Sequence, residues 1–160
     1  MDNLFIVCVD DQREVLNALT ADLEALEPLL QIEECESVSE AWDVIESIDA
    51  SGDHMALVIT DQVMPENSGV DLLKKLSKDY RFDRTKTILL TGQATHKDTI
   101  DAINTTQLDL YVEKPWDREG LLKMIKTLIT KYLLDAGIDY SDYTSVIDQD
   151  TLLANLRKTT

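Results

Sequence analysis

The chain has 160 residues, 44% of them hydrophobic, which is enough for one domain core of ordinary size and a short appendage but too little for two full domains. Its 15 basic and 31 acidic residues give a net charge of −16, which argues against direct binding to nucleic acid or to anionic membranes. No stretch approaches the ~20 apolar residues of a membrane helix, and the 2 cysteines lack metal-ligand spacing, so we expect a soluble cytoplasmic protein.

Apolar segments of strand length alternate with segments of helical periodicity along most of the chain. The first apolar run, residues 4–9, stops abruptly at Asp10 and Asp11, as a buried parallel strand would. A helical pattern then runs from Arg13 until Pro28 halts it. Further strands are expected at 30–35, 56–60, 87–90 and 108–112, each followed by a helix.

Five strand-helix units of this size predict an α/β fold, with a doubly wound five-stranded parallel sheet covered by helices on both faces. We expect the strand order 2-1-3-4-5 of flavodoxin-like (βα)5 folds, an order taken from known folds of this kind and not worked out from the residues. Residues 134–160 are predicted to form an acidic linker and a short amphipathic helix with Leu152, Leu153 and Leu156. For this tail, a linker or a helix folded back on the domain is favoured over a dedicated dimerisation or docking helix.

Polar residues stand where four of the five strands end. Asp10 and Asp11 follow the first strand, Asp61 follows the third, Thr91 ends the fourth, and Lys114 comes just after the fifth. In open parallel sheets the carboxyl ends of the strands share one edge, where ligands bind, so we expect these side chains to converge. Any one of the aspartates alone could be a solvated loop residue, whereas the complete set favours a site.

The residue types at these positions indicate phosphoryl chemistry. Three close carboxylates raise one another's pKa unless a cation lies between them. Oxygen ligands without His or Cys favour Mg²⁺ as this cation. We expect Asp11 and Asp61 to hold the ion, with Asp10 contributing through a water. Asp61 can attack phosphorus as a carboxylate nucleophile and form an acyl phosphate. Lys114 and Thr91 can offer the phosphoryl group a positive charge and a hydrogen bond. We therefore expect a Mg²⁺-dependent phosphoacceptor with slow self-dephosphorylation, which is not an enzyme in the turnover sense.

At these positions the chain resembles the receiver domains of two-component response regulators, in particular the chemotaxis-regulator type. The matching segments are VCVDDQ (7–12), VITDQVMP (58–65), LLTGQA (89–94) and YVEKPW (111–116). The resemblance covers about residues 4–133 and implies a receiver domain at 1–133 followed by the tail at 134–160. It also implies a phosphohistidine donor, carried by a sensor histidine kinase or a histidine phosphotransfer protein. The output would reach a downstream protein or a fused effector domain through the fourth helix, fifth strand and fifth helix, and a homodimer is a further alternative.

The resemblance implies roles for further residues. Thr91 and Tyr111 would form a switch, in which the threonine hydroxyl follows the phosphoryl group and the ring turns inward. The backbone carbonyl of Val63 would join the metal ligands, and the Lys114–Pro115 peptide would be cis. Val63 and Gln93 occupy the positions that tune hydrolysis of the acyl phosphate; valine cannot orient water by hydrogen bonding, whereas the glutamine amide can.

Two other classes of function stay open at this point. An aspartate-nucleophile phosphatase also forms an acyl phosphate, but such enzymes generally carry a second aspartate two residues after the nucleophile, where Val63 follows Asp61 and Gln12 follows Asp10. A docking domain that is never phosphorylated is weakened by the completeness of the site. Trp116, directly after the Lys-Pro pair, is expected to pack against the last helix of the domain in preference to contacting a partner.

Overall fold

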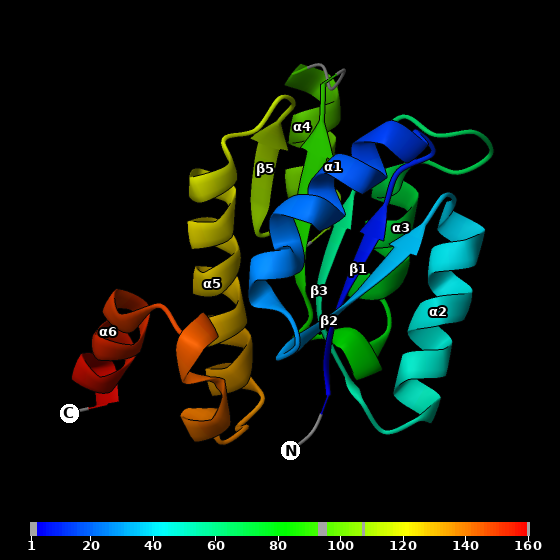
Figure 1. The fold of residues 1–160 in the computed structure, drawn as a ribbon. Coiled ribbons are helices and arrows are strands. Elements are labelled where there is room, and N and C mark those ends of the chain that lie inside the picture. The colour runs from blue at the N-terminus through cyan, green and yellow to red at the C-terminus, as the bar shows by residue number, and fades with distance from the viewer. Residues whose placement is uncertain (1–2, 93–95, 107, 160) are drawn as a thin grey trace.

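The computed structural model describes residues 3–92, 96–106 and 108–159 of the chain and contains one five-stranded parallel sheet. The strands are β1 (Leu4–Val9), β2 (Leu30–Cys35), β3 (His54–Thr60), β4 (Lys86–Thr91) and β5 (Leu110–Glu113). Their order is β2-β1-β3-β4-β5, as predicted (Figure 1). The central strands β1 and β3 are continuous apolar runs whose side chains are nearly all buried, because helices cover both faces of the sheet.

Helices connect the strands and follow the last of them. In the described residues they are α1 (Arg13–Leu23), α2 (Val38–Ala50), α3 (Gly69–Ser77), α4 (His96–Thr105), α5 (Arg118–Asp135) and α6 (Gln149–Thr159), with 3₁₀ segments η1 (Glu24–Leu26), η2 (Tyr80–Phe82) and η3 (Tyr140–Val146). Four helix starts are fixed by side chains: Ser37, Ser68, Asp117 and Asp148 each accept a hydrogen bond from the backbone N–H three residues later. Each such cap satisfies an N–H group that the helix itself leaves without a partner.

The helices create two apolar cores, one on each face of the sheet. Helices α1 and α5 cover one face, where Leu16 and Ile125 are fully buried. Helices α2 and α3 cover the other face, where Ile45 and Leu72 are fully buried, and α4 packs beside α3 (Figure 1). This doubly wound arrangement places the carboxyl ends of β1 and β3 next to each other in the middle of one sheet edge.

The segment after α5 folds back on the domain. In η3, Tyr143 and Val146 are almost completely buried, and Ile147 follows them into the core shared by α1 and α5. The backbone N–H of Asp148 then donates to the Thr130 hydroxyl of α5 (2.8 Å), which fixes the entry to α6. The fold-back expected as one alternative for the tail is therefore present, whereas the division of the chain at residue 133 stays a prediction.

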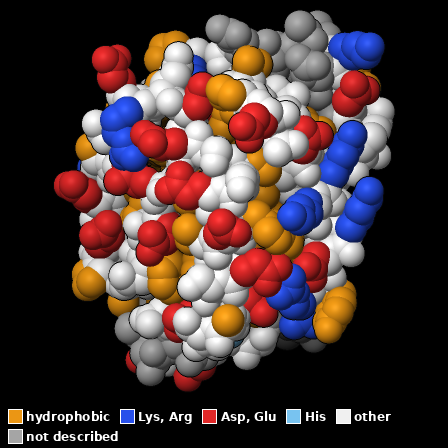
Figure 2. Space-filling model, turned by 90° about the vertical axis from the view of Figure 1, so that its right-hand side faces the viewer, with side chains coloured by type: hydrophobic (Ala, Val, Ile, Leu, Met, Phe, Trp, Pro, Cys, Tyr) orange, Lys and Arg blue, Asp and Glu red, His pale blue; other side chains and the backbone are white. Residues whose placement is uncertain are grey.

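The surface reflects the net charge of −16. Figure 2 shows acidic side chains scattered over most of one face, with Lys and Arg mainly along its right-hand edge. Helix α6 is amphipathic but leaves Leu153 and Leu156 about half exposed. In the parts of the chain that the structure describes, no helix is both long and apolar enough to cross a bilayer.

Candidate functional site

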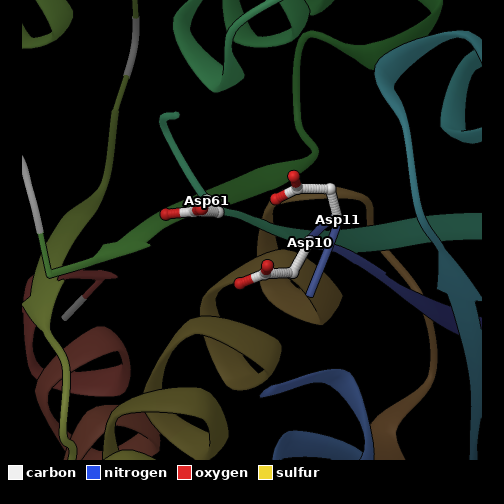
Figure 3. Close-up of side chains that lie close together, drawn as sticks. All are labelled: Asp10, Asp11 and Asp61. Carbon is white, nitrogen blue, oxygen red and sulfur yellow. The ribbon is translucent and has the colours of Figure 1, made fainter. Parts of the chain in front are cut away.

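The register between β1 and β3 brings two aspartates to the same point. Val9 at the end of β1 pairs with Thr60 at the end of β3, so the residues that follow them, Asp10 and Asp61, lie side by side. The backbone N–H of Asp61 donates to the carbonyl of Val9 (2.9 Å), which continues the ladder one step beyond the strands. Figure 3 shows the carboxylates of Asp10, Asp11 and Asp61 turned to the same side.

These three carboxylates form a group that fits a divalent cation. One oxygen atom from each lies within 4.8 Å of the other two. Asp10 and Asp61 are buried, whereas Asp11 is exposed. Oxygen donors without histidine or cysteine are the ligand set of a hard cation, and Mg²⁺ binds to one or two carboxylates while it keeps several waters. The residues present therefore fit the predicted metal.

Lys114 reaches the two buried carboxylates from the far side of the sheet edge. Its Nζ lies 2.6 Å from Asp10 Oδ2 and 3.4 Å from Asp61 Oδ1. The backbone N–H of Lys114 donates to the Thr91 carbonyl (3.2 Å), which holds the end of β5 on β4. The Lys114–Pro115 peptide is cis, as the family resemblance implies. The Lys114 ammonium group therefore forms ion pairs with carboxylates that follow two different strands.

The carboxyl group of Asp61 is in surroundings that disfavour its charged form. Burial raises its pKa above the ordinary value, and the negative charge of Asp10 adds to the rise. A hydrogen bond with the Thr91 side chain and the positive charge of Lys114 lower the pKa without cancelling this effect. A cation bound beside Asp61 would favour the ionised form, which is the form that can act as a nucleophile.

An open cavity of about 360 Å³ lies at these groups. Its wall includes Asp11, Asp61, Thr91 and Lys114, so groups from β1, β3, β4 and β5 face one space. Val63 also lines it, and its side chain is 52% exposed, so the predicted lifetime-tuning position borders the place where water would enter. Gln93, the other predicted position of this kind, lies outside the described residues.

The main chain at Asp61 is held by contacts that sequence reasoning missed. The Thr60 hydroxyl donates to the Asp61 carbonyl (2.9 Å), and a Cβ atom on Gly69 would stand only 2.0 Å from the same oxygen. The Gln62 carbonyl accepts from the N–H of Gly69 (3.0 Å), and its side-chain oxygen accepts from the N–H of Val70 (2.9 Å). No sequence pattern identifies Gln62, because a glutamine that caps a later helix looks like any other polar loop residue. The need for glycine at position 69 was also missed, because it comes from a contact with the Asp61 carbonyl in another segment of the chain.

Thr91 and Tyr111 occupy neighbouring strands on one face of the sheet. Tyr111 pairs with Leu89 in the β4–β5 ladder, and Leu89 and Thr91 are two residues apart, so their side chains point the same way. Thr91 is 1% exposed, whereas Tyr111 is half-buried and packs against the core beneath α2 and α3. The two residues of the predicted switch therefore lie diagonally across neighbouring strands on the same face of the sheet, and their role as a switch stays a prediction.

Comparison with known sequences agrees with this arrangement. The sequence model of the family described as response regulator receiver domain matches residues 6–126. The chain is 29% identical over 127 residues to response regulator Rre1 of Synechocystis sp., in a match that covers 79% of this chain and 52% of Rre1. It is 33% identical over 96 residues to chemotaxis protein CheY1 of Helicobacter pylori, covering 60% of this chain and 73% of that protein. The chain thus spans about half the length of Rre1.

Solved structures show the same fold. The signal receiver domain of an HD domain-containing protein from Pseudomonas fluorescens superposes with a TM-score of 0.75 at 26% identity, covering 86% of this chain and 94% of that one. A CheY-like response regulator receiver domain protein from Methanospirillum hungatei gives a TM-score of 0.72 at 25% identity, covering 84% and 99%.

Proposed function

Because the chain belongs to the response-regulator receiver family of two-component signalling, we propose that it accepts a phosphoryl group on Asp61 in a Mg²⁺-dependent reaction. The donor would be a phosphohistidine of a sensor histidine kinase or of a histidine phosphotransfer protein. One observation carries the proposal: the Lys114 ammonium and the buried carboxylates of Asp10 and Asp61 meet at the strand ends beside an open cavity. Positive charge held in advance where a phosphoryl group arrives lowers the barrier to its transfer.

The transfer itself needs few groups. A carboxylate oxygen of Asp61 attacks phosphorus, and an O–P bond forms as the N–P bond of the phosphohistidine breaks and its electron pair goes to the imidazole nitrogen. Lys114 pairs with a phosphoryl oxygen. The Thr91 hydroxyl, which bonds to the Asp61 side chain before transfer, donates to the phosphoryl group afterwards. Positioning and charge neutralisation are the main contributions a protein makes to this kind of reaction.

Asp10, Asp11 and Asp61, together with the backbone carbonyl of Val63, would hold the Mg²⁺ ion. When bound, the ion neutralises negative charge on the phosphoryl oxygens. Three carboxylates within 4.8 Å of one another with one ammonium beside them leave an excess of negative charge, so the residues of this site attract a dication.

We place the output of phosphorylation on the surface of α4, β5 and α5. As the Thr91 hydroxyl follows the phosphoryl group, Tyr111 gains room to turn inward, and the populations of two conformations shift. The changed surface would bind a downstream protein, a fused effector domain or a second copy of the chain. Val63 and Gln93 would set the lifetime of the acyl phosphate, and the protein would act in the cytoplasm as a signalling module with no turnover of its own.

The test is the mass of the intact protein after incubation with acetyl phosphate, with and without Mg²⁺. We expect a gain of one phosphoryl group that requires Mg²⁺ and disappears in Asp61→Asn. Asp43→Asn makes the same chemical change on the exposed side of α2 and should keep the adduct. An adduct on the Asp61→Asn protein would contradict the assignment of the acceptor. Continuous phosphate release from many donors would favour a phosphatase, and a wild-type protein without any adduct would favour a docking domain.

A further inference from the structure

The side chain of Trp116 joins the loop that carries Lys114 to helix α1. Trp116 lies two residues after Lys114, and its ring is half-buried against the core shared by α1 and α5. The packing expected for this residue is therefore confirmed. In addition, its indole N–H donates to Oδ2 of Asp22 on α1 (2.8 Å), a residue 94 positions away in the chain.

Helix α1 connects the two sides of the site. It begins just after Asp10 and Asp11, and its last turn carries Asp22 (Figure 1). In the sheet, β1 is separated from β5 by β3 and β4, so no ladder hydrogen bond directly sets the distance from Asp10 to Lys114. The contact between Asp22 and Trp116 is a direct link from α1 to the loop between β5 and α5.

The other groups in this loop and at the start of α5 are less suited to fix the loop against α1. Pro115 has no N–H to donate, and the Asp117 side chain is used to cap α5, where it accepts from the N–H of Gly120 (2.8 Å). Arg118 approaches Asp22 at 3.6 Å, but its side chain is half exposed and also pairs with Glu119, so this ion pair contributes little. The indole-to-carboxylate bond is part-buried and charge-assisted, which makes it the strongest of these contacts with α1.

We propose that Asp22 and Trp116 form a positioning pair, which holds the loop so that the Lys114 ammonium stands where the arriving phosphoryl group requires it. This inference rests on the proposed transfer to Asp61. Neither member of the pair touches the reacting atoms. Without the bond, the loop and the base of the lysine side chain gain freedom, and a small displacement of a charge that must meet the transition state slows the reaction.

The experiment measures the rate of adduct formation over a range of acetyl phosphate concentrations with saturating Mg²⁺. Asp22→Ala and Trp116→Phe should each lower the maximal rate about tenfold, with the half-saturating donor concentration changed less than about twofold. Asp22→Asn keeps an oxygen that accepts the indole N–H and should restore most of the rate. Arg118→Ala removes only the exposed ion pair and serves as the matched control, with a rate near that of the wild type.

The same substitutions in a Lys114→Met background separate positioning from a general structural role. With no ammonium to position, Asp22→Ala should slow the remaining reaction no further, whereas equal slowing in both backgrounds would overturn the proposal. Wild-type rates in Asp22→Ala and Trp116→Phe would overturn it as well. Asp22 lies on α1 and Trp116 lies in the loop after β5, so if one of the two variants folds poorly, the other still tests the proposal. A wild-type protein that forms no adduct would instead refute the proposed function itself.

Discussion

Replacing Asp61 by asparagine should stabilise the metal-free protein at neutral pH, although it removes the proposed phosphoacceptor. Oxygens of the three site aspartates lie within 4.8 Å of one another, and two unit charges at that distance repel by about 3 kcal/mol at an effective dielectric constant of ~20. Lys114 attracts Asp61 by about 5 kcal/mol at 3.4 Å on the same scale, but this ammonium is shared with Asp10 at 2.6 Å. The cost of burial and the repulsion from Asp10 together exceed the attraction, in agreement with the raised pKa of Asp61. We expect a gain of about 1–2 kcal/mol in the free energy of unfolding.

The pH dependence of this gain has a definite sign. Because the pKa of Asp61 is raised in the folded protein, the folded state binds the proton more tightly than the unfolded chain does. The wild type therefore gains stability as the pH falls through the folded pKa toward the ordinary value of 3.8. Asparagine has no proton to gain, so its advantage is complete above the folded pKa and shrinks as the pH falls. Mg²⁺ should also reduce it, since a ligand of the folded wild type stabilises that state.

Urea denaturation at neutral pH with EDTA, repeated at lower pH and with Mg²⁺, measures the effect. For a chain of this size a gain of 1–2 kcal/mol corresponds to a rise in Tm of about 3–6 °C. Asp43→Asn controls for the loss of one negative charge and should change the free energy of unfolding by less than about 0.5 kcal/mol. Either of two results would show that the charge of Asp61 does not destabilise the metal-free protein in this way: an Asp61→Asn protein no more stable than the wild type in EDTA, or an advantage that persists in saturating Mg²⁺.

Three further changes probe other parts of the structure. Gly69→Ala should cost about 3 kcal/mol of unfolding free energy in a urea titration, because its Cβ would stand 2.0 Å from the Asp61 carbonyl oxygen. Gly92→Ala, whose Cβ would have its nearest neighbour at 3.6 Å, should change the unfolding free energy little in the same titration. Tyr143→Ala should cost about 3–5 kcal/mol through the cavity it leaves in the core, and unchanged urea unfolding would show that η3 does not pack as described. Burial raises the pKa of Cys35 to about 12, so its thiol should stay protonated at neutral pH and react with iodoacetamide only after urea unfolds the chain. Rapid alkylation of the native protein, measured by mass spectrometry, would contradict this expectation.

The sheet and the convergence of the site could be predicted because both rest on short-range signals. Apolar runs that stop at Asp10, Asp61 and Glu113 mark the ends of strands, and parallel strands bring those ends to one edge. The limits of elements were less predictable. The last strand, expected at 108–112, begins at Leu110. Just before it, the N–H of Asp109 donates to the Thr87 carbonyl (3.2 Å), while the Asp109 carboxylate accepts from the N–H of Thr87 (2.8 Å).

Contacts between distant segments could not be read from the sequence. Tyr143 lies in an acidic tail without periodicity, so nothing local shows that it is buried against α1 and α5. The partner of the Trp116 indole is 94 positions away. The helical pattern from Arg13 was expected to continue to Pro28, but α1 ends at Leu23 and the chain tightens into η1, a difference that amphipathic periodicity alone does not reveal.

The close packing of Gly69 on the Asp61 carbonyl means that the main chain of the proposed acceptor cannot move toward a donor. With Gln62 bound to the first two N–H groups of α3, the end of β3 and the start of α3 behave as one rigid unit. A donor protein would therefore have to adjust its own approach until phosphorus lies in line with the Asp61 carboxylate. We expect the displacement that would follow phosphorylation to occur at the end of β4 and in the loop after β5, while the half of the sheet that contains β2 keeps its conformation.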